Sequence, residues 1–187
     1  MVYKLRADRS RYLNAYLSPD EVEARIGDYF LLDEPEWKDF WQPMEITFQD
    51  DGDKRNAITP PDITLWFTSN NLILNQKAYA ALKDELAEYG ELLPVSCEGV
   101  PYWLCHLTMK TGPEAVDLSQ SDRFVDEGEY VNLKKLAFKE QAVKDLLVFQ
   151  SEYTGFINLY CTERFKSLLQ QHDLKGLLFS TDLVSII

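Results

Sequence analysis

Residues 155–179 contain the most regular pattern in the chain: Gly155-Phe-Ile-Asn-Leu-Tyr-Cys161, then Thr162-Glu-Arg-Phe-Lys-Ser-Leu-Leu-Gln-Gln-His172, then Asp173-Leu-Lys-Gly-Leu-Leu-Phe179. The first part is rich in residues that favour strands, the second has the spacing of a capped helix, and the third returns to strand-forming residues. The sequence therefore predicts a strand, a helix and a return strand. This unit holds no recognisable catalytic constellation and is expected to serve packing.

The predicted helix within this unit has two distinct faces. Its apolar positions recur at helical spacing and are expected to face a sheet, whereas its charged and polar positions are expected to face water. The sheet-facing residues are Phe165, Leu168 and Leu169, and the water-facing residues are Glu163, Lys166 and Gln170.

The rest of the chain predicts further strands and two more helices. Strands are expected at residues 3–7, 44–48, 62–67, about 131–138 and 145–150. Ser18 and Pro19 mark one helix start, and Asn75 caps a second helix that Gly90 is expected to end. The second helix carries an apolar stripe at Tyr79, Leu82, Leu86 and Tyr89. The simplest fold class is α+β: one domain over residues 1–187, with a largely antiparallel sheet and a few packed helices.

A hairpin is expected around Glu98-Gly99, because these two residues have the composition of a tight turn. The turn sets a register in which Cys97 faces Val100 and Cys105 faces Leu92, so that the two cysteines are too far apart to form a disulfide. Pro94 and Pro101 cannot donate to a strand ladder, which predicts a sheet edge or a bulge at this hairpin.

The chain is strongly acidic. Its 187 residues carry 19 Lys and Arg against 31 Asp and Glu, for a net charge of −12. Residues 1–60 and 61–120 each contribute −5, and residues 121–187 contribute −2. This field repels nucleic acid and anionic lipid and attracts basic partners; alternatively, the acidity serves solubility alone. With no secretory signal, no membrane-spanning run and only three Cys, a cytoplasmic location is expected.

Acidic residues in two segments of the first half are the candidate partner-binding residues. In residues 33–41 carboxylates alternate with Trp37, Phe40 and Trp41, a combination suited to an interface. The alternative is a surface helix whose three aromatic side chains pack on the core. A second acidic group follows at residues 50–53, where an exposed turn is a better interpretation than a calcium loop, since the loop's final Glu is absent. The candidates are Asp33, Glu34, Glu36, Asp39, Asp50, Asp51 and Asp53.

Groups suited to catalysis or metal binding are sparse. His106 and Cys105 are neighbours on a predicted strand and point to opposite faces, and His172 has no partner at metal-ligand spacing, so no metal site is expected. Cys161 precedes a helix start but has no nearby base, which favours a buried structural thiol. We therefore predict no catalytic residue, no cofactor and no metal.

The pattern that ends at Phe179 resembles the carboxy-terminal motif of a bacterial immunity-protein family, family eleven, whose members accompany polymorphic toxins. Thr162-Glu-Arg-Phe-Lys166 and Leu174-Lys-Gly-Leu-Leu-Phe179 carry the likeness. Further agreement follows the chain order: Pro61-Asp62, the helix from Asn75 to Tyr89, Glu91-Leu-Leu-Pro-Val95, Asp117-Leu-Ser-Gln-Ser121 and Val148-Phe149. Residues 61–187 are thus expected to be a family-like core, and residues 1–60 an N-terminal portion with little likeness.

The resemblance implies a protein that binds and neutralises a cognate toxin and is not an enzyme. An acidic inhibitor suits a basic toxin, because complementary charge accelerates association. Two other classes stay open: a small enzyme whose site gathers scattered residues such as Cys161, His106 and Asp117, and a general acidic interaction or scaffold domain. The sequence leaves the oligomeric state open.

Overall fold

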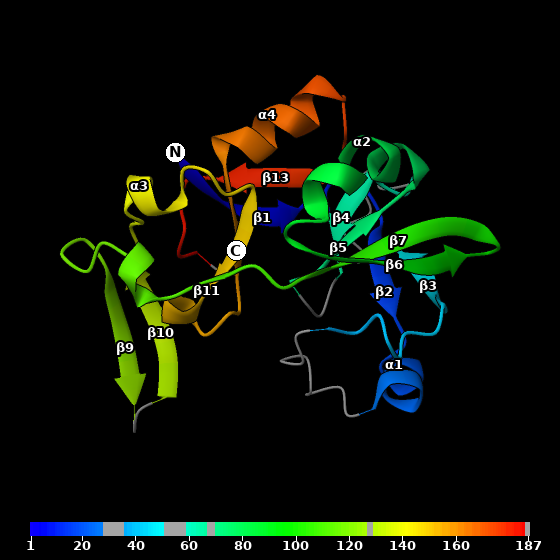
Figure 1. Cartoon of the computed structure of the whole chain (residues 1–187), viewed down its shortest axis with the longest axis horizontal. Helices are drawn as coiled ribbons and strands as arrows, with labels where there is room; N and C mark the ends of the chain where they lie inside the picture. The colour runs from blue at the N-terminus through cyan, green and yellow to red at the C-terminus, as the bar shows by residue number, and fades with distance from the viewer. Residues whose placement is uncertain (28–35, 51–58, 67–69, 127–128, 186–187) are drawn as a thin grey trace. The chain divides into compact units, whose positions relative to one another are not determined.

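The computed structural model describes residues 1–27, 36–50, 59–66, 70–126 and 129–185. It has an α+β fold in which most strand pairs are antiparallel and helices pack against the sheets, which confirms the predicted fold class (Figure 1). None of the helices in these ranges is long and apolar enough to cross a membrane.

The chain forms two compact units that are interleaved in sequence. The first unit comprises Met1–Leu5, Met109–Gln170 and Phe179–Ile187, and the second comprises Arg6–Thr108 and Gln171–Leu178. The sequence predicts a division at residue 60, whereas these two units divide the chain at other positions. The division at residue 60 stays a prediction.

The second unit is built on a six-stranded sheet with the order β2-β3-β6-β7-β5-β4. β3 and β6 run parallel, and the other neighbours are antiparallel. The elements are β2 (Asn14–Leu17), α1 (Pro19–Ile26), β3 (Met44–Gln49), β4 (Ile63–Leu65), β5 (Leu72–Leu74), α2 (Gln76–Leu86), β6 (Gly90–Cys97) and β7 (Val100–Leu107).

The six-stranded sheet curls on itself. A parallel bridge between Ala15 of β2 and Trp66, the residue after β4, joins the two ends of the strand order. The side chains inside the curl form an apolar core cluster, which the two ends of the sheet share. The core members are Ala15, Leu17, Val22, Trp37, Met44, Ile46, Trp66, Ile73, Leu93, Val95 and Leu104.

The predicted hairpin and its register are confirmed. Cys97 pairs with Val100 and Leu92 with Cys105, and Figure 1 shows β6 and β7 side by side up to their shared turn. Glu98 and Gly99 have positive φ angles of 50° and 78°, as a two-residue hairpin turn requires. All three cysteines are free thiols.

The expectation that Pro94 and Pro101 place this hairpin at an edge or a bulge is wrong, because β6 and β7 lie inside the sheet and pair without a register shift. The carbonyl oxygen of Pro94 accepts a hydrogen bond from Trp41 Nε1 at 2.9 Å and so points away from β7. In an antiparallel pair the N–H and C=O of one residue point to the same side, so proline here removes no bond to β7. Pro101 lies opposite Ser96, two residues along β6, at the same kind of position.

Both predicted helix starts in the second unit are confirmed. The side chains of Ser18 and Asn75 cap α1 and α2 by accepting hydrogen bonds from backbone N–H groups three residues on. The predicted role of Gly90 is wrong, since α2 ends at Leu86 and Gly90 is the first residue of β6. A Cβ atom on Gly90 would lie 2.0 Å from the carbonyl oxygen of His106, so glycine is needed there for the close approach of β7.

The first unit contains a five-stranded sheet with the order β13-β1-β12-β11-β8 and a separate two-stranded ribbon of β9 and β10. β1 and β13 each continue into residues assigned to the second unit. The elements are β1 (Val2–Ala7), β8 (Lys110–Thr111), η1 (Pro113–Ala115), β9 (Asp122–Asp126), β10 (Glu129–Lys135), α3 (Glu140–Val143), β11 (Val148–Ser151), η2 (Glu152–Thr154), β12 (Leu159–Thr162), α4 (Glu163–Gln171) and β13 (Leu177–Ser180).

The carboxy-terminal strand, helix and strand are confirmed as β12, α4 and β13. Phe165 and Leu169 are buried, and Glu163 and Gln170 are exposed, as expected. The expectation that Lys166 faces water is wrong. Its side chain is only 26% exposed, because its Nζ donates to the Tyr3 hydroxyl at 3.0 Å and lies over the Tyr3 ring.

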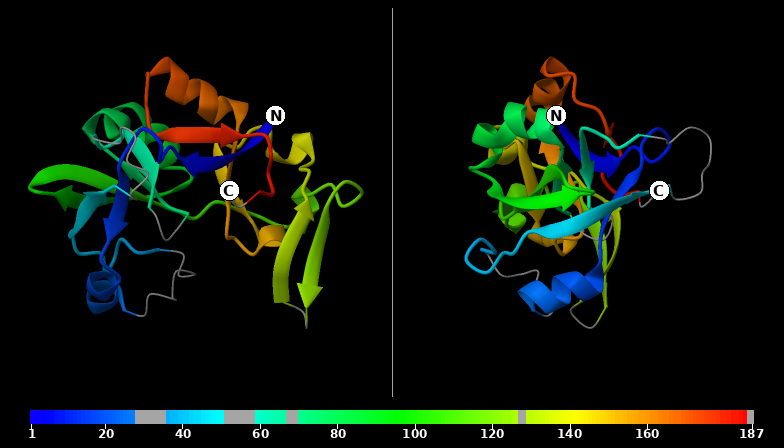
Figure 2. Two further views of the ribbon diagram at one scale, coloured as in Figure 1. Left: turned by 180° about the vertical axis from the view of Figure 1, so that it is seen from behind. Right: turned by 90° about the vertical axis from the view of Figure 1, so that its right-hand side faces the viewer.

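The two-stranded ribbon was not fully expected from the sequence. β10 and β11 overlap the two predicted regions, but β9 lies in a polar segment that carries no strand pattern. The left view of Figure 2 shows β9 and β10 side by side. Their register shifts twice, which explains why no clean alternation of apolar and polar residues marks the pair.

Candidate functional site

The carboxylate of Glu91, at the start of β6, has three hydrogen-bonding partners in the second unit. Its Oε2 accepts hydrogen bonds from the backbone N–H of Trp37 at 2.6 Å and lies 3.0 Å from His106 Nδ1, while Oε1 accepts from the N–H of Lys38 at 3.0 Å. The Glu91 and His106 side chains are 13% and 4% exposed. The sequence analysis missed this pair, although the hairpin register places the two residues directly opposite each other.

Glu91 is held in its ionised form. Burial would raise the pKa of this carboxyl, but the hydrogen bonds from Trp37, His106 and Lys38 outweigh burial and leave the pKa below its ordinary value of 4.5. A charged carboxylate that binds two backbone N–H groups fixes the segment that contains them.

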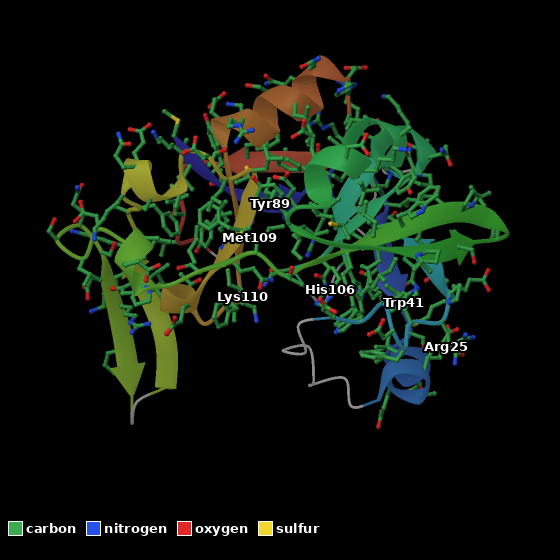
Figure 3. All side chains as sticks on the ribbon, in the orientation of Figure 1. Arg25, Trp41, Tyr89, His106, Met109 and Lys110 are labelled. Carbon is green, nitrogen blue, oxygen red and sulfur yellow. The ribbon has the colours of Figure 1, made fainter. Side chains whose placement is uncertain are left out.

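Stacked rings extend from this carboxylate. The Trp37 ring lies on His106 with centroids 3.8 Å apart, and Trp41 stacks on Trp37 at 5.9 Å. Figure 3 shows the labelled His106, Trp41 and Arg25 following one another along one side of the β6–β7 hairpin. Because Trp37 contacts Glu91 and Trp41 contacts Pro94, residues 37–41 follow the edge of β6 towards β3.

The predicted helix at residues 33–41 is wrong for the part that the structure describes. Residues 38–40 form a turn, and the amide of Phe40 donates to the Trp37 carbonyl. Core packing of the aromatic residues is confirmed for Trp37, which is buried, and for Trp41, which packs against the core. Phe40 is 41% exposed and therefore belongs to the surface.

The three acidic candidates that the structure describes do not gather into one patch. Glu36 and Asp39 are exposed on the segment anchored at Glu91, and Asp50 is exposed just after β3. β3 reaches β6 at the pair of Glu45 and Ser96, which lies five residues from Glu91 and five from Asp50. Glu91 and Asp50 are thus each about 17 Å from the Glu45–Ser96 pair, measured along the strands. Asp33, Glu34, Asp51 and Asp53 lie outside the described residues.

The net charge is concentrated in the second unit. Its segments contain 20 acidic and 10 basic residues, a net charge of −10, whereas the first unit has 11 acidic and 9 basic residues and a net charge of −2. Since charge steers association at the surface where it is exposed, the second unit is the one suited to a basic partner.

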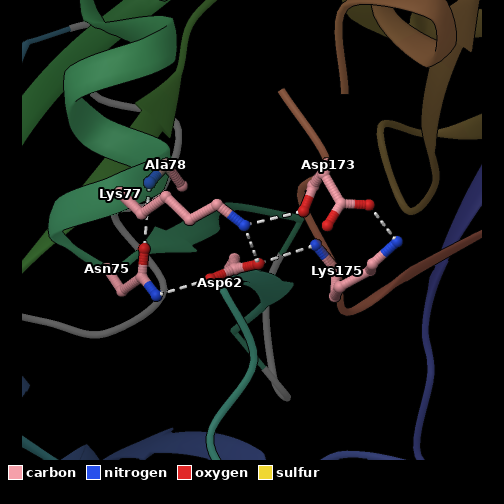
Figure 4. A network of polar contacts seen from close by, with 6 residues as sticks. All are labelled: Asp62, Asn75, Lys77, Ala78, Asp173 and Lys175. Atoms are coloured by element: carbon pink, nitrogen blue, oxygen red, sulfur yellow. Dashed lines mark hydrogen bonds and ion pairs between the residues drawn. The ribbon is translucent and has the colours of Figure 1, made fainter. Parts of the chain in front are cut away.

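A second carboxylate, Asp62, joins three parts of the second unit (Figure 4). Its Oδ1 accepts from Asn75 Nδ2 at 2.9 Å, and its Oδ2 accepts from Lys77 Nζ at 3.1 Å and from the Lys175 amide at 3.0 Å. Lys77 Nζ also donates to the Asp173 carbonyl at 2.7 Å. The Asp62 network thus ties the segment after α4 to β4 and to the start of α2.

The residues that carry the family resemblance are engaged in such structural contacts. Asp62, Asn75 and Lys175 belong to the Asp62 network. Asp117 Oδ1 accepts from the Ser119 amide and hydroxyl, and its Oδ2 accepts from Gln120 Nε2, which closes a local turn. These motif residues therefore have structural roles in the fold.

We expect Asp62→Asn to destabilise the protein by about 2 kcal/mol, because the new NH₂ group would face a donor in either orientation of the amide: Asn75 Nδ2 in one, and the Lys77 ammonium with the Lys175 amide in the other. Asp173→Asn is the matched control: its side chain is 77% exposed, and Asn tolerates the positive φ of 49°. Urea unfolding of both variants is the measurement. Equal midpoints for the two variants would contradict the role of the Asp62 network.

The residues of the enzyme alternative show no activated nucleophile. Cys161 is fully buried on β12, and burial, followed by the charge of Glu163, raises the pKa of its thiol. His106 is engaged with Glu91 and Trp37, and Asp117 closes its turn. Within the described ranges, no three His, Cys, Asp or Glu side chains are grouped to hold a metal ion.

Alkylation of the native protein should distinguish the three thiols. Cys97 is half-buried, whereas Cys105 and Cys161 are buried, and burial raises the pKa of Cys105 to about 12. Iodoacetamide at neutral pH is expected to modify Cys97 alone until denaturant is added. Peptide mass mapping over time is the measurement, and rapid modification of Cys161 would contradict its structural role.

Comparison of the sequence with the models of known protein families and with curated proteins finds no match.

Proposed function

We propose that this chain is a bacterial immunity protein that acts in the cytoplasm. It binds a cognate polymorphic toxin through protein–protein contact and blocks the toxin's active site or substrate path, without catalysing a reaction. The observation that carries the proposal is the concentration of charge in the second unit, whose net charge is −10. Such a field suits a basic toxin, for example one that acts on nucleic acid.

The structural contacts that the motif residues make support the same function. A protein that inhibits by binding needs a rigid scaffold, because a surface that is ordered before binding loses less entropy when the complex forms. The Glu91 carboxylate and the Asp62 network supply rigidity in the second unit by fixing backbone segments far apart in sequence.

The test begins with the product of the neighbouring gene, which is expected to be a large secreted protein with a modular toxin end. Its purified toxin domain should bind the chain with nanomolar affinity, equivalent to about −12 kcal/mol, and lose activity at equimolar ratio. Absence of binding at micromolar concentration would contradict the proposed function.

Ionic strength tests the charge separately. The association rate should fall at least tenfold between low and high salt, because screening shortens the reach of the acidic field. Stopped-flow fluorescence is a suitable measurement. Tight binding with a salt-independent association rate would support the immunity function but contradict the role of charge in association.

A further inference from the structure

An apolar patch lies at the turn end of the β6–β7 hairpin. It consists of Phe48 from β3, Cys97 from β6, and Val100 and Tyr102 from β7, and we call it the hairpin-end patch. Val100 is 54% exposed, and the other three side chains are half-buried against the core. The Phe48 and Tyr102 rings are 5.2 Å apart, and the Phe48 amide donates to the Cys97 thiol.

Two carboxylates lie at the turn end of this patch. Glu45 Oε1 accepts a hydrogen bond from the Glu98 amide at 3.1 Å, and both side chains are exposed. Residues 42–50 and 93–102 contain no Lys or Arg.

The patch is held in a fixed geometry. Eight consecutive residue pairs, from Gly90–Leu107 to Cys97–Val100, keep one register up to the turn. The Glu45 carboxylate holds Glu98, the first residue of the turn, by accepting a hydrogen bond from the Glu98 amide. A surface that is ordered before binding avoids much of the entropy cost of association.

We propose that the hairpin-end patch is the surface of this chain that binds the toxin, and that it takes a basic segment carrying an apolar side chain. The apolar side chain packs on Val100 and Tyr102, and the cationic groups pair with Glu45 and Glu98 at the turn end. An apolar centre with a polar rim is the usual anatomy of a specific interface. This inference rests on the proposed function and adds the location and chemistry of the contact.

The exposed face of α2 supplies a matched control within the same unit. Asp84 and Glu85 are exposed there, but α2 contributes none of the large exposed hydrophobic side chains among the described residues. If charge alone determined binding, changes on α2 and at the hairpin-end patch would have equal effects.

The test compares two double variants with the same change in charge. Glu45→Lys with Val100→Lys alters the hairpin-end patch, and Ala80→Lys with Asp84→Lys alters exposed positions of α2. We expect the first to weaken binding of the neighbour-encoded toxin domain about 100-fold and the second about threefold. Thermal midpoints equal to that of the wild type establish that both variants fold. Equal losses, or none at the patch, would overturn the location while the proposed function stands.

A second experiment distinguishes failure of the proposed function from failure of the proposed contact surface. Cys97 belongs to the patch, so its alkylation by iodoacetamide reports occupancy. If the wild type does not bind the toxin domain, the proposed function fails, and a synthetic peptide of alternating Lys and Leu tests the patch itself. The peptide should slow Cys97 alkylation in the wild type and leave the Glu45→Lys, Val100→Lys variant unaffected. Unchanged alkylation in the wild type would overturn the inference.

Discussion

Gly90→Ala is expected to destabilise the protein by about 3 kcal/mol or more. The new Cβ would lie 2.0 Å from the carbonyl oxygen of His106 and 2.9 Å from Leu107 Cα. These are backbone atoms of β7, which pairs with β6 over eight residues and with β5 on its other side. Neither strand can retreat without loss of ladder hydrogen bonds.

Gly112→Ala is the control for this substitution. The Cβ on Gly112 would meet only the carboxylate end of Glu114, a side chain that can rotate away. Thermal unfolding by circular dichroism should show a large loss of stability for the first variant and little change for the second. A Gly90→Ala variant with wild-type stability would contradict the close approach of β6 and β7.

Glu91→Ala is expected to have the second largest effect, about 3 kcal/mol at neutral pH. Removal of the carboxylate leaves the amides of Trp37 and Lys38 and the ring of His106 without the acceptor that now satisfies them. Each donor that loses its acceptor in a partly buried site costs about 1 kcal/mol or more. Residues 36–41 should then detach from β6, which a rise in Trp41 solvent accessibility by fluorescence quenching would report.

The effect of Glu91→Ala should depend on pH. Because the folded-state pKa of Glu91 lies below its ordinary value of 4.5, its stabilisation is fully present above that value and is lost as pH falls through the folded-state pKa. The stability difference between wild type and Glu91→Ala should therefore shrink in acid. A difference that is constant down to pH 3 would contradict an ionised Glu91.

Local sequence signals predicted the elements that depend on a few neighbouring residues. The Glu98-Gly99 turn gave the full register of β6 and β7, since a two-residue turn fixes every pair that follows. Ser18 and Asn75 marked the two helix starts because a cap acts within one turn. The carboxy-terminal strand, helix and strand followed from strand propensity and helical spacing.

Features that depend on distant partners were not predictable. The turn at residues 38–40 is held by Glu91, more than fifty residues away, so helical spacing of the aromatic residues was misleading. The curl of the six-stranded sheet depends on the bridge of Ala15 and Trp66. The acidic candidates could be selected from composition. The hairpin-end patch could not be predicted, because its apolar side chains come from β3 and β7, which are distant in sequence.

Titration of the purified chain into the neighbour-encoded toxin domain, with toxin activity followed in the same samples, is the most direct measurement of the proposed function. We predict a 1:1 complex with a dissociation constant of about 1 nM or lower, and complete loss of toxin activity at equimolar ratio. A toxin domain that stays fully active and unbound at about 10 μM of the chain would contradict the immunity function.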